Sequence, residues 1–109
     1  MNELFGTDAV KQWVDLGKGV FRKVLVHNQD LMLVSVKFES GAIGEVHQHP
    51  HVQTSYVQSG KFLYTIGDKQ QLLNSGDGCI VPTNAWHGCE CLEKGVLIDS
   101  FTPRRDDFL

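Results

Sequence analysis

Apolar and polar residues alternate with a period of two along most of the chain, and turns rich in glycine interrupt the alternation. This period is typical of β-strands that bury one face, because successive side chains of a strand point to opposite sides. In residues 31–39, for example, Met32, Val34 and Val36 share one face. The pattern predicts strands over residues 20–26, 31–39, 44–57, 61–66, 71–74, 79–82, 86–91 and 95–101.

One segment before these strands departs from the alternation. Val10, Trp13 and Val14 recur at helical spacing, so a short helix is expected within residues 8–16. With so little helix and so many short, closely spaced strands, the fold class is predicted to be all-β, a barrel or a sandwich. The 109 residues allow one domain. We expect an N-terminal arm over residues 1–17, a barrel over residues 18–103 and a C-terminal tail over residues 104–109.

The charge balance excludes one class of partner. Ten lysines and arginines against 13 aspartates and glutamates give a formal net charge of −3, so no basic excess exists to neutralise the phosphates of a nucleic acid. The chain has no long apolar run, and its start carries Glu3, Asp8 and Asp15 where a signal peptide has an apolar core. The three cysteines are an odd number without a C-x-x-C pair, which argues against a disulfide framework. We therefore expect a cytoplasmic protein without nucleic-acid or membrane partners.

Histidines gather in one short stretch of the chain. His47 and His49 stand two residues apart with Gln53 in the same parity, so all three side chains reach one side of an extended strand. His87, in another predicted strand, is a fourth candidate. Imidazoles that converge in this way are typical ligands of Zn, Cu, Fe or Ni. A lone histidine is more often structural, but an H-x-H pair followed by an amide favours a metal site.

Other residues near these histidines have simpler interpretations. His51 shares their parity, but Pro50 is expected to bend the strand and leave His51 beside the ligands rather than among them. Cys89 and Cys91 share the parity of His87, so a zinc site made of these three residues is an alternative. We interpret both thiols as small buried side chains near the site. Packing or structural roles are expected for three further residues, Cys79, Trp86 and His27.

Two stretches of the chain resemble the two sequence motifs of cupins. The first consists of Gly41, His47-x-His49, Gln53 and Gly60, with Gln53 in the place of the usual glutamate. The second consists of Gly76, Pro82 and His87, with Asn84 where glycine is common and Cys91 where asparagine is common. The resemblance implies a small antiparallel barrel of jelly-roll type that binds one divalent metal ion inside. Its ligands, by position, would be His47, His49, Gln53 and His87.

From about Trp13 to the C-terminus, the chain is similar to the single-domain cupins of pectin and alginate breakdown, the KdgF type, which open 4,5-unsaturated uronate monosaccharides. In that family a carboxylate, an aromatic residue and an arginine accompany the metal. The spacing D-x-F-T-P-x-R places them at Asp99, Phe101 and Arg105. The resemblance implies an anionic sugar as substrate, a divalent transition metal (Ni, Zn, Fe or Mn) as cofactor, and a linear 5-keto uronate as product. A homodimer is also expected, because small cupin barrels often pair.

The chemistry of the implied residues agrees with a non-redox reaction. Three imidazoles and a neutral amide leave the charge of a divalent ion uncompensated, which makes a strong Lewis acid and a poor site for redox-cycling iron. Asp99 lies in an apolar run, where burial raises the pKa of a carboxyl toward values useful in acid–base catalysis. The planar guanidinium of Arg105 suits a carboxylate, although residues 104–107 are a mixed-charge run typical of surfaces. Two other functions stay open: a small metal-dependent cupin dioxygenase, and a non-catalytic cupin that binds or senses a sugar.

Overall fold

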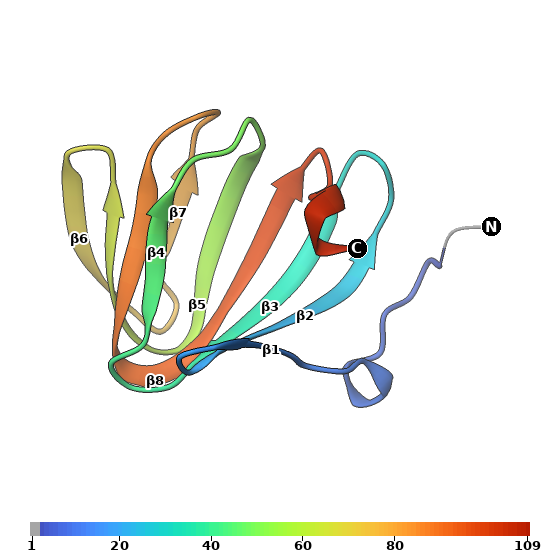
Figure 1. The fold of residues 1–109 in the computed structure, drawn as a ribbon, viewed down its shortest axis with the longest axis horizontal. Coiled ribbons are helices and arrows are strands. Elements are labelled where there is room, and N and C mark those ends of the chain that lie inside the picture. Colours follow the sequence, from blue (N-terminus) through green and yellow to red (C-terminus); the bar gives the residue numbers. More distant parts are fainter. Residues whose placement is uncertain (1–2) are drawn as a thin grey trace.

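Two long antiparallel strands organise the fold, which a computed structural model describes for residues 3–109. Strand β5 (Val52–Ile66) pairs with β8 (His87–Thr102) along nearly its whole length, from Val52 opposite Thr102 to Ile66 opposite His87. Both strands bend, so each belongs to two sheets that face one another (Figure 1). The all-β prediction is confirmed, and the arrangement is a jelly-roll barrel.

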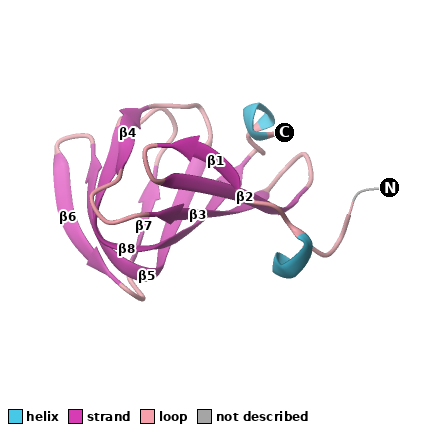
Figure 2. Cartoon of the chain, turned by 60° about the horizontal axis from the view of Figure 1, so that its bottom comes forward, coloured by secondary structure: helices cyan, strands magenta, loops and turns pink. Residues whose placement is uncertain are grey.

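Each sheet is completed by shorter strands on either side of this pair. One sheet contains β1 (Val14–Gly17), β2 (Val20–His27) and β3 (Met32–Phe38) next to the second half of β8, and β7 (Gly78–Val81) next to the first half of β5. The other contains β4 (Ile43–His47) beside the first half of β8, and β6 (Lys69–Asn74) beside the second half of β5. Two 3₁₀ turns, η1 (Asp8–Val10) and η2 (Asp106–Phe108), lie near the chain ends (Figure 2).

The period of two in the sequence separates the interior from the surface. The inward positions of β3, β5 and β8 form the core, and Phe38 and Phe62 pack edge to face with ring centres 5.2 Å apart. A second, smaller cluster contains Met32, Val34 and Phe101. Burial of these apolar side chains is the main favourable term in folding. It also fixes which face of β5 and β8 lines the interior.

A bend replaces one turn that the sequence suggested. Residues 59–60 were expected to separate two strands, but β5 continues through them with a shift of register. Gly60 has φ +88°, and a Cβ atom at this position would lie 2.6 Å from the carbonyl oxygen of Glu93. Only glycine fits such a close approach in this conformation. The strand can therefore pass from one sheet to the other without ending, and β8 does the same over residues 92–94.

The helix predicted within residues 8–16 is wrong. Only η1 is helical, and Val14–Gly17 forms β1. Gly17, Lys18 and Gly19 all have positive φ and fold β1 back on β2. Trp13 is held in an extended segment by two ammonium groups, with Nζ of Lys23 4.3 Å and Nζ of Lys37 4.5 Å from its ring centre. These contacts outweigh a weak local preference for helix.

The predicted boundaries change in two further places. The strand expected over residues 44–57 is interrupted at residues 48–51, next to Pro50, which has no N–H to donate to a sheet. The arm expected over residues 1–17 supplies β1 to the sheet, and its first two residues lie outside the described part. No helix within residues 3–109 is long and apolar enough to cross a membrane.

Candidate functional site

Three histidines meet at one mouth of the barrel. His47 ends β4 and His87 begins β8, where the two residues are register partners with ring centres 4.3 Å apart. His49 follows in the irregular residues 48–51, with its ring centre 4.8 Å from that of His87. One ligand atom from each histidine lies within 4.8 Å of those of the other two. The predicted convergence of these three side chains is therefore present.

The three rings are oriented in the same way. In each ring Nδ1 lies within hydrogen-bond distance of a backbone carbonyl two residues away, which leaves Nε2 facing the other rings. The partners are the carbonyl of Glu45 for His47 at 2.8 Å, of His51 for His49 at 3.1 Å, and of Ala85 for His87 at 3.0 Å. Such carbonyl contacts hold the tautomer in which Nε2 carries a free electron pair, as in metal-binding histidines.

Burial keeps the inner histidines neutral. Desolvation lowers the pKa of His87 to about 4 and also lowers the pKa of His49. Nε2 of His87 is buried and has no hydrogen-bond partner among residues 3–109. An unpaired buried nitrogen costs free energy unless a cation or donor meets it, so the arrangement fits a metal ion.

Gln53, on β5, completes the group. Its amide nitrogen donates hydrogen bonds to Oγ of Ser55 at 3.1 Å and to the hydroxyl of Tyr64 at 3.4 Å. The amide oxygen is thereby turned toward His49 and lies 2.9 Å from Nε2 of that ring. Two ligand atoms about 2.1 Å from one ion and roughly at right angles lie about 3 Å apart. Gln53 can therefore share an ion with the three histidines.

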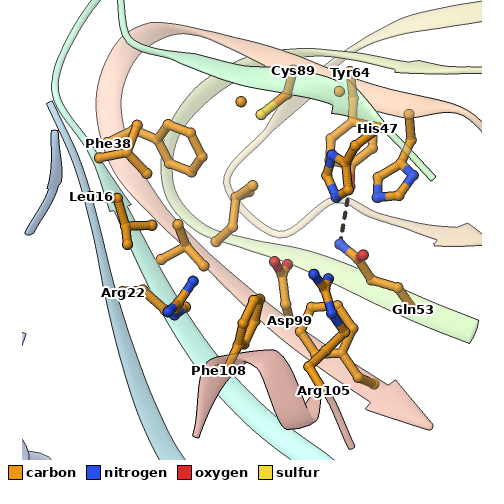
Figure 3. A pocket seen from close by; sticks show the side chains of 17 residues that line it. Leu16, Arg22, Phe38, His47, Gln53, Tyr64, Cys89, Asp99, Arg105 and Phe108 are labelled. Carbon is orange, nitrogen blue, oxygen red and sulfur yellow. Dashed lines mark hydrogen bonds between the residues drawn. The ribbon is translucent and has the colours of Figure 1, made fainter. Parts of the chain in front are cut away.

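A carboxyl, an aromatic ring and an arginine line the same cavity, which has a volume of about 150 Å³ (Figure 3). Asp99, on β8, is 7% exposed, and its Oδ1 is buried without a hydrogen-bond partner in the described part of the chain. Burial raises the pKa of Asp99 to about 7, opposed by Ser55 and by the positive charge of Arg105. Phe101 lies two residues on, with its ring centre 5.8 Å from that of His49. The guanidinium carbon of Arg105 lies 5.3 Å from the Phe101 ring centre.

Several residues in or next to the cavity were missed in the sequence. Tyr64 and Ser55 hold the amide of Gln53, while Phe108 and Arg22 line the wall near Arg105. The sequence signal for Arg22 was its position two residues from both Val20 and Val24, which places all three side chains on the same face of β2. No comparable pattern marks Phe108, which reaches the cavity from η2.

The remaining predicted residues lie as follows. Cys89 lines the cavity, whereas Cys91 lies in the core, and within the described residues the histidine cluster includes neither thiol. His51 lies beside the cluster and donates from Nε2 to the carbonyl of Arg104 at 3.1 Å. Cys79 packs against the core as expected. The expectation that Trp86 packs is wrong, since its side chain lies in the loop before β8 and is 54% exposed.

Comparison with known proteins identifies the family. Residues 34–99 match the cupin domain family. Over 99 residues the chain is 44% identical to the pectin degradation protein KdgF of Dickeya dadantii, and the match covers 89% of this chain and 90% of that protein. The chain belongs to the KdgF family of cupins.

Two solved structures resemble this chain over nearly its whole length. The structure of KdgF from Halomonas sp. matches with a TM-score of 0.94 at 39% identity, covering 98% of this chain and 99% of that one. An RmlC-like cupin from Shewanella frigidimarina matches with a TM-score of 0.95 at 39% identity, covering 98% of this chain and 96% of that one. The similarity thus covers nearly the whole chain.

Proposed function

We propose that this KdgF-family chain is a metal-dependent enzyme that opens the ring of 4,5-unsaturated uronate monosaccharides in pectin, alginate or uronate catabolism. Its relative in Dickeya dadantii is named as a pectin degradation protein, which supports the substrate class. The observation that carries the reaction is Asp99, a buried carboxyl with a pKa raised to about 7, in the cavity that His47 and His87 of the histidine cluster also line. A group that titrates near neutral pH can both accept and donate a proton.

His47, His49, Gln53 and His87 would hold one divalent transition metal ion, of which Ni, Zn, Fe and Mn are candidates. When bound, the ion supplies Lewis-acid polarisation of the sugar oxygens. The neutral donor set supports a non-redox role, because it leaves the charge of the ion uncompensated.

Asp99 carries the proton transfer in this proposal. Its carboxylate accepts the proton of the hydroxyl at C1, and the bond between C1 and the ring oxygen breaks as C1 becomes an aldehyde. The ring oxygen leaves as the enolate oxygen on C5, and the proton held by Asp99 goes to C4, so that C5 becomes the keto group. No water is added and nothing is oxidised, so the product is an isomer of the substrate.

Phe101 and Arg105 position the sugar. The Phe101 ring forms a wall of the cavity between the histidines and the tail, where it excludes water from the ring of the substrate. The guanidinium of Arg105 supplies positive charge for the sugar carboxylate. With a net charge of −3 on the chain, attraction of an anion depends on such local charges.

Loss of the enol-ether ultraviolet absorbance tests the reaction. We expect the metal-loaded protein to remove this absorbance from an unsaturated uronate monosaccharide faster than the spontaneous ring opening does. A rate equal to the spontaneous rate, with metal bound, rejects the proposal. The cytoplasmic location and the homodimer stay predictions, and sedimentation velocity of the purified protein tests the second.

A further inference from the structure

Arg22 occupies an unusual position in the cavity. It lies on β2 opposite Val36 of β3, and its side chain lines the same cavity as Asp99 and Arg105. The surroundings at this part of the cavity are apolar, with Leu16 and Val20 among the lining residues. Burial lowers the pKa of Arg22, which reflects the cost of removing a guanidinium from water.

The guanidinium of Arg22 has no acceptor in the described part of the chain. No hydrogen bond or ion pair is formed by its nitrogens there; its close contact is the ring of Phe108, 3.8 Å from the guanidinium carbon. Arg105 differs, because its Nε and Nη2 donate to the two carboxylate oxygens of Asp107 at 3.0 and 2.8 Å. Asp107 therefore occupies the edge of Arg105 formed by Nε and Nη2, whereas no acceptor among the described residues occupies the corresponding edge of Arg22.

Phe108 brings the two arginines to one wall. The guanidinium carbon of Arg105 lies 4.3 Å from the centre of the same ring that Arg22 contacts. In the view of Figure 3, Arg22 and Arg105 stand on either side of Phe108 and Asp99. Stacking on an aromatic ring restrains a guanidinium while its N–H groups stay available.

From this geometry we infer that Arg22 is a second substrate-binding residue, which receives the carboxylate of the sugar together with Arg105. The inference rests on the proposed function for its ligand, an acidic monosaccharide. A planar, partly desolvated guanidinium with an open edge is suited to bidentate binding of a carboxylate. Within the described residues Asp107 acts on Arg22 only through its charge, which raises the pKa of Arg22, so the sugar carboxylate would supply the hydrogen-bonded acceptor.

Binding of a saturated uronate tests this role without turnover. D-galacturonate lacks the C4–C5 double bond, and D-galactose is its neutral counterpart. Both sugars are titrated into the zinc-loaded protein and its variants, with dissociation constants from amide chemical shifts. We expect the protein to bind galacturonate more tightly than galactose, and Arg22→Met to weaken galacturonate binding about tenfold or more while galactose binding changes less than about twofold. Arg22→Lys, which keeps the charge but not the planar edge, is expected to lie between.

Arg104→Met is the matched control. Arg104 lies in the tail next to Arg105, pairs with exposed Asp106 and is not among the residues that line the cavity. Its loss is therefore expected to leave both affinities unchanged. Amide spectra and zinc content confirm that each variant is folded and loaded.

Three results would overturn the inference: galacturonate binding by Arg22→Met equal to that of the unchanged protein, equal weakening of both sugars, or no preference of the unchanged protein for galacturonate. Equal weakening would assign Arg22 a packing role against Phe108. Failure of the ring-opening assay with the expected titration results would instead reject the reaction and retain a carboxylate site.

Discussion

The amide oxygen of Gln53 lies 2.9 Å from Nε2 of His49, so two atoms that carry electron pairs face each other inside the barrel. Ser55 and Tyr64 hold the amide in this orientation by accepting hydrogen bonds from its nitrogen. The arrangement is unfavourable without a cation or a proton between the two atoms. It is the local feature that most directly supports a metal ion bound by a neutral donor set.

Gln53→Glu changes the charge of this donor set. We expect the variant to bind a divalent metal about tenfold more tightly, because a carboxylate adds Coulomb attraction, and to turn over more slowly, because the same charge weakens the Lewis acid. Competition with a metal chelator measures the affinity. Gln58→Glu, at an exposed position of the same strand, should alter neither property. Weaker metal binding by Gln53→Glu would contradict a ligand role.

His87→Ala is expected to abolish stoichiometric metal binding. The substitution removes the most buried of the three imidazoles, whose Nε2 has no hydrogen-bond partner among the residues that the structure describes. His27→Ala, at a histidine outside the cluster, is the matched control and should retain the metal. Metal content after gel filtration is the measurement, and a full complement in His87→Ala would count against the site.

Asp99 links stability to pH. Its pKa in the folded chain is raised from 3.8 to about 7 by burial, so the folded state holds a proton that the unfolded state has lost. The stabilising contribution is therefore complete below about pH 4 and is lost as the pH rises through 7. Asp99→Asn should melt higher than the unchanged metal-free protein at pH 8, by about 5 °C or more, with little difference at pH 4. Asp68→Asn, in the exposed turn between β5 and β6, should show no such dependence.

The same substitution separates an enzyme from a binding protein. Asn has nearly the shape of Asp but cannot transfer a proton, so Asp99→Asn should lower turnover roughly 10²-fold or more. Metal affinity and sugar binding should change only slightly. Normal turnover by Asp99→Asn would indicate another proton carrier. If neither the unchanged protein nor Asp99→Asn turned over substrate, the result would favour a sensor.

Asp107→Asn and Asp106→Asn form a matched pair of variants. Asp107 holds Arg105 through two hydrogen bonds, and that arginine lowers the pKa of Asp107, whereas Asp106 pairs with Arg104 away from the cavity. Asp107→Asn should raise KM about three- to tenfold by loosening Arg105, with a smaller change in kcat. Asp106→Asn should leave both constants unchanged. Equal effects of the two substitutions would assign Asp107 a role in the stability of the tail alone.

The sequence predicted those features that depend on strand parity. Asp99 points inward with Phe101 because alternation along β8 decides which face each side chain joins. His47 and Gln53 also reach one cavity as expected, but they lie on β4 and β5, which the irregular residues 48–51 separate. The same rule places Arg22 on one face with Val20 and Val24, but a single charge on a short strand gives no reason to expect a ligand, and its position in the cavity emerged only from the structure.

Features that depend on contacts between distant segments were not predictable. Trp13 is extended because lysines of β2 and β3 meet its ring, which local spacing cannot reveal. Phe108 joins the site only because the tail folds back over the mouth of the barrel, and the orientation of the Gln53 amide depends on Tyr64 across a bend of β5. Each of these contacts forms only when the barrel is closed.

Proton NMR of the reaction in D₂O tests the central claim most directly. With metal-loaded protein, the vinylic signal of an unsaturated uronate should disappear faster than in buffer alone, and the linear 5-keto product should carry one deuterium at C4. Asp99→Asn should bring the rate close to that of buffer. A vinylic signal that decays at the spontaneous rate, or a product other than the linear keto sugar, would contradict the account.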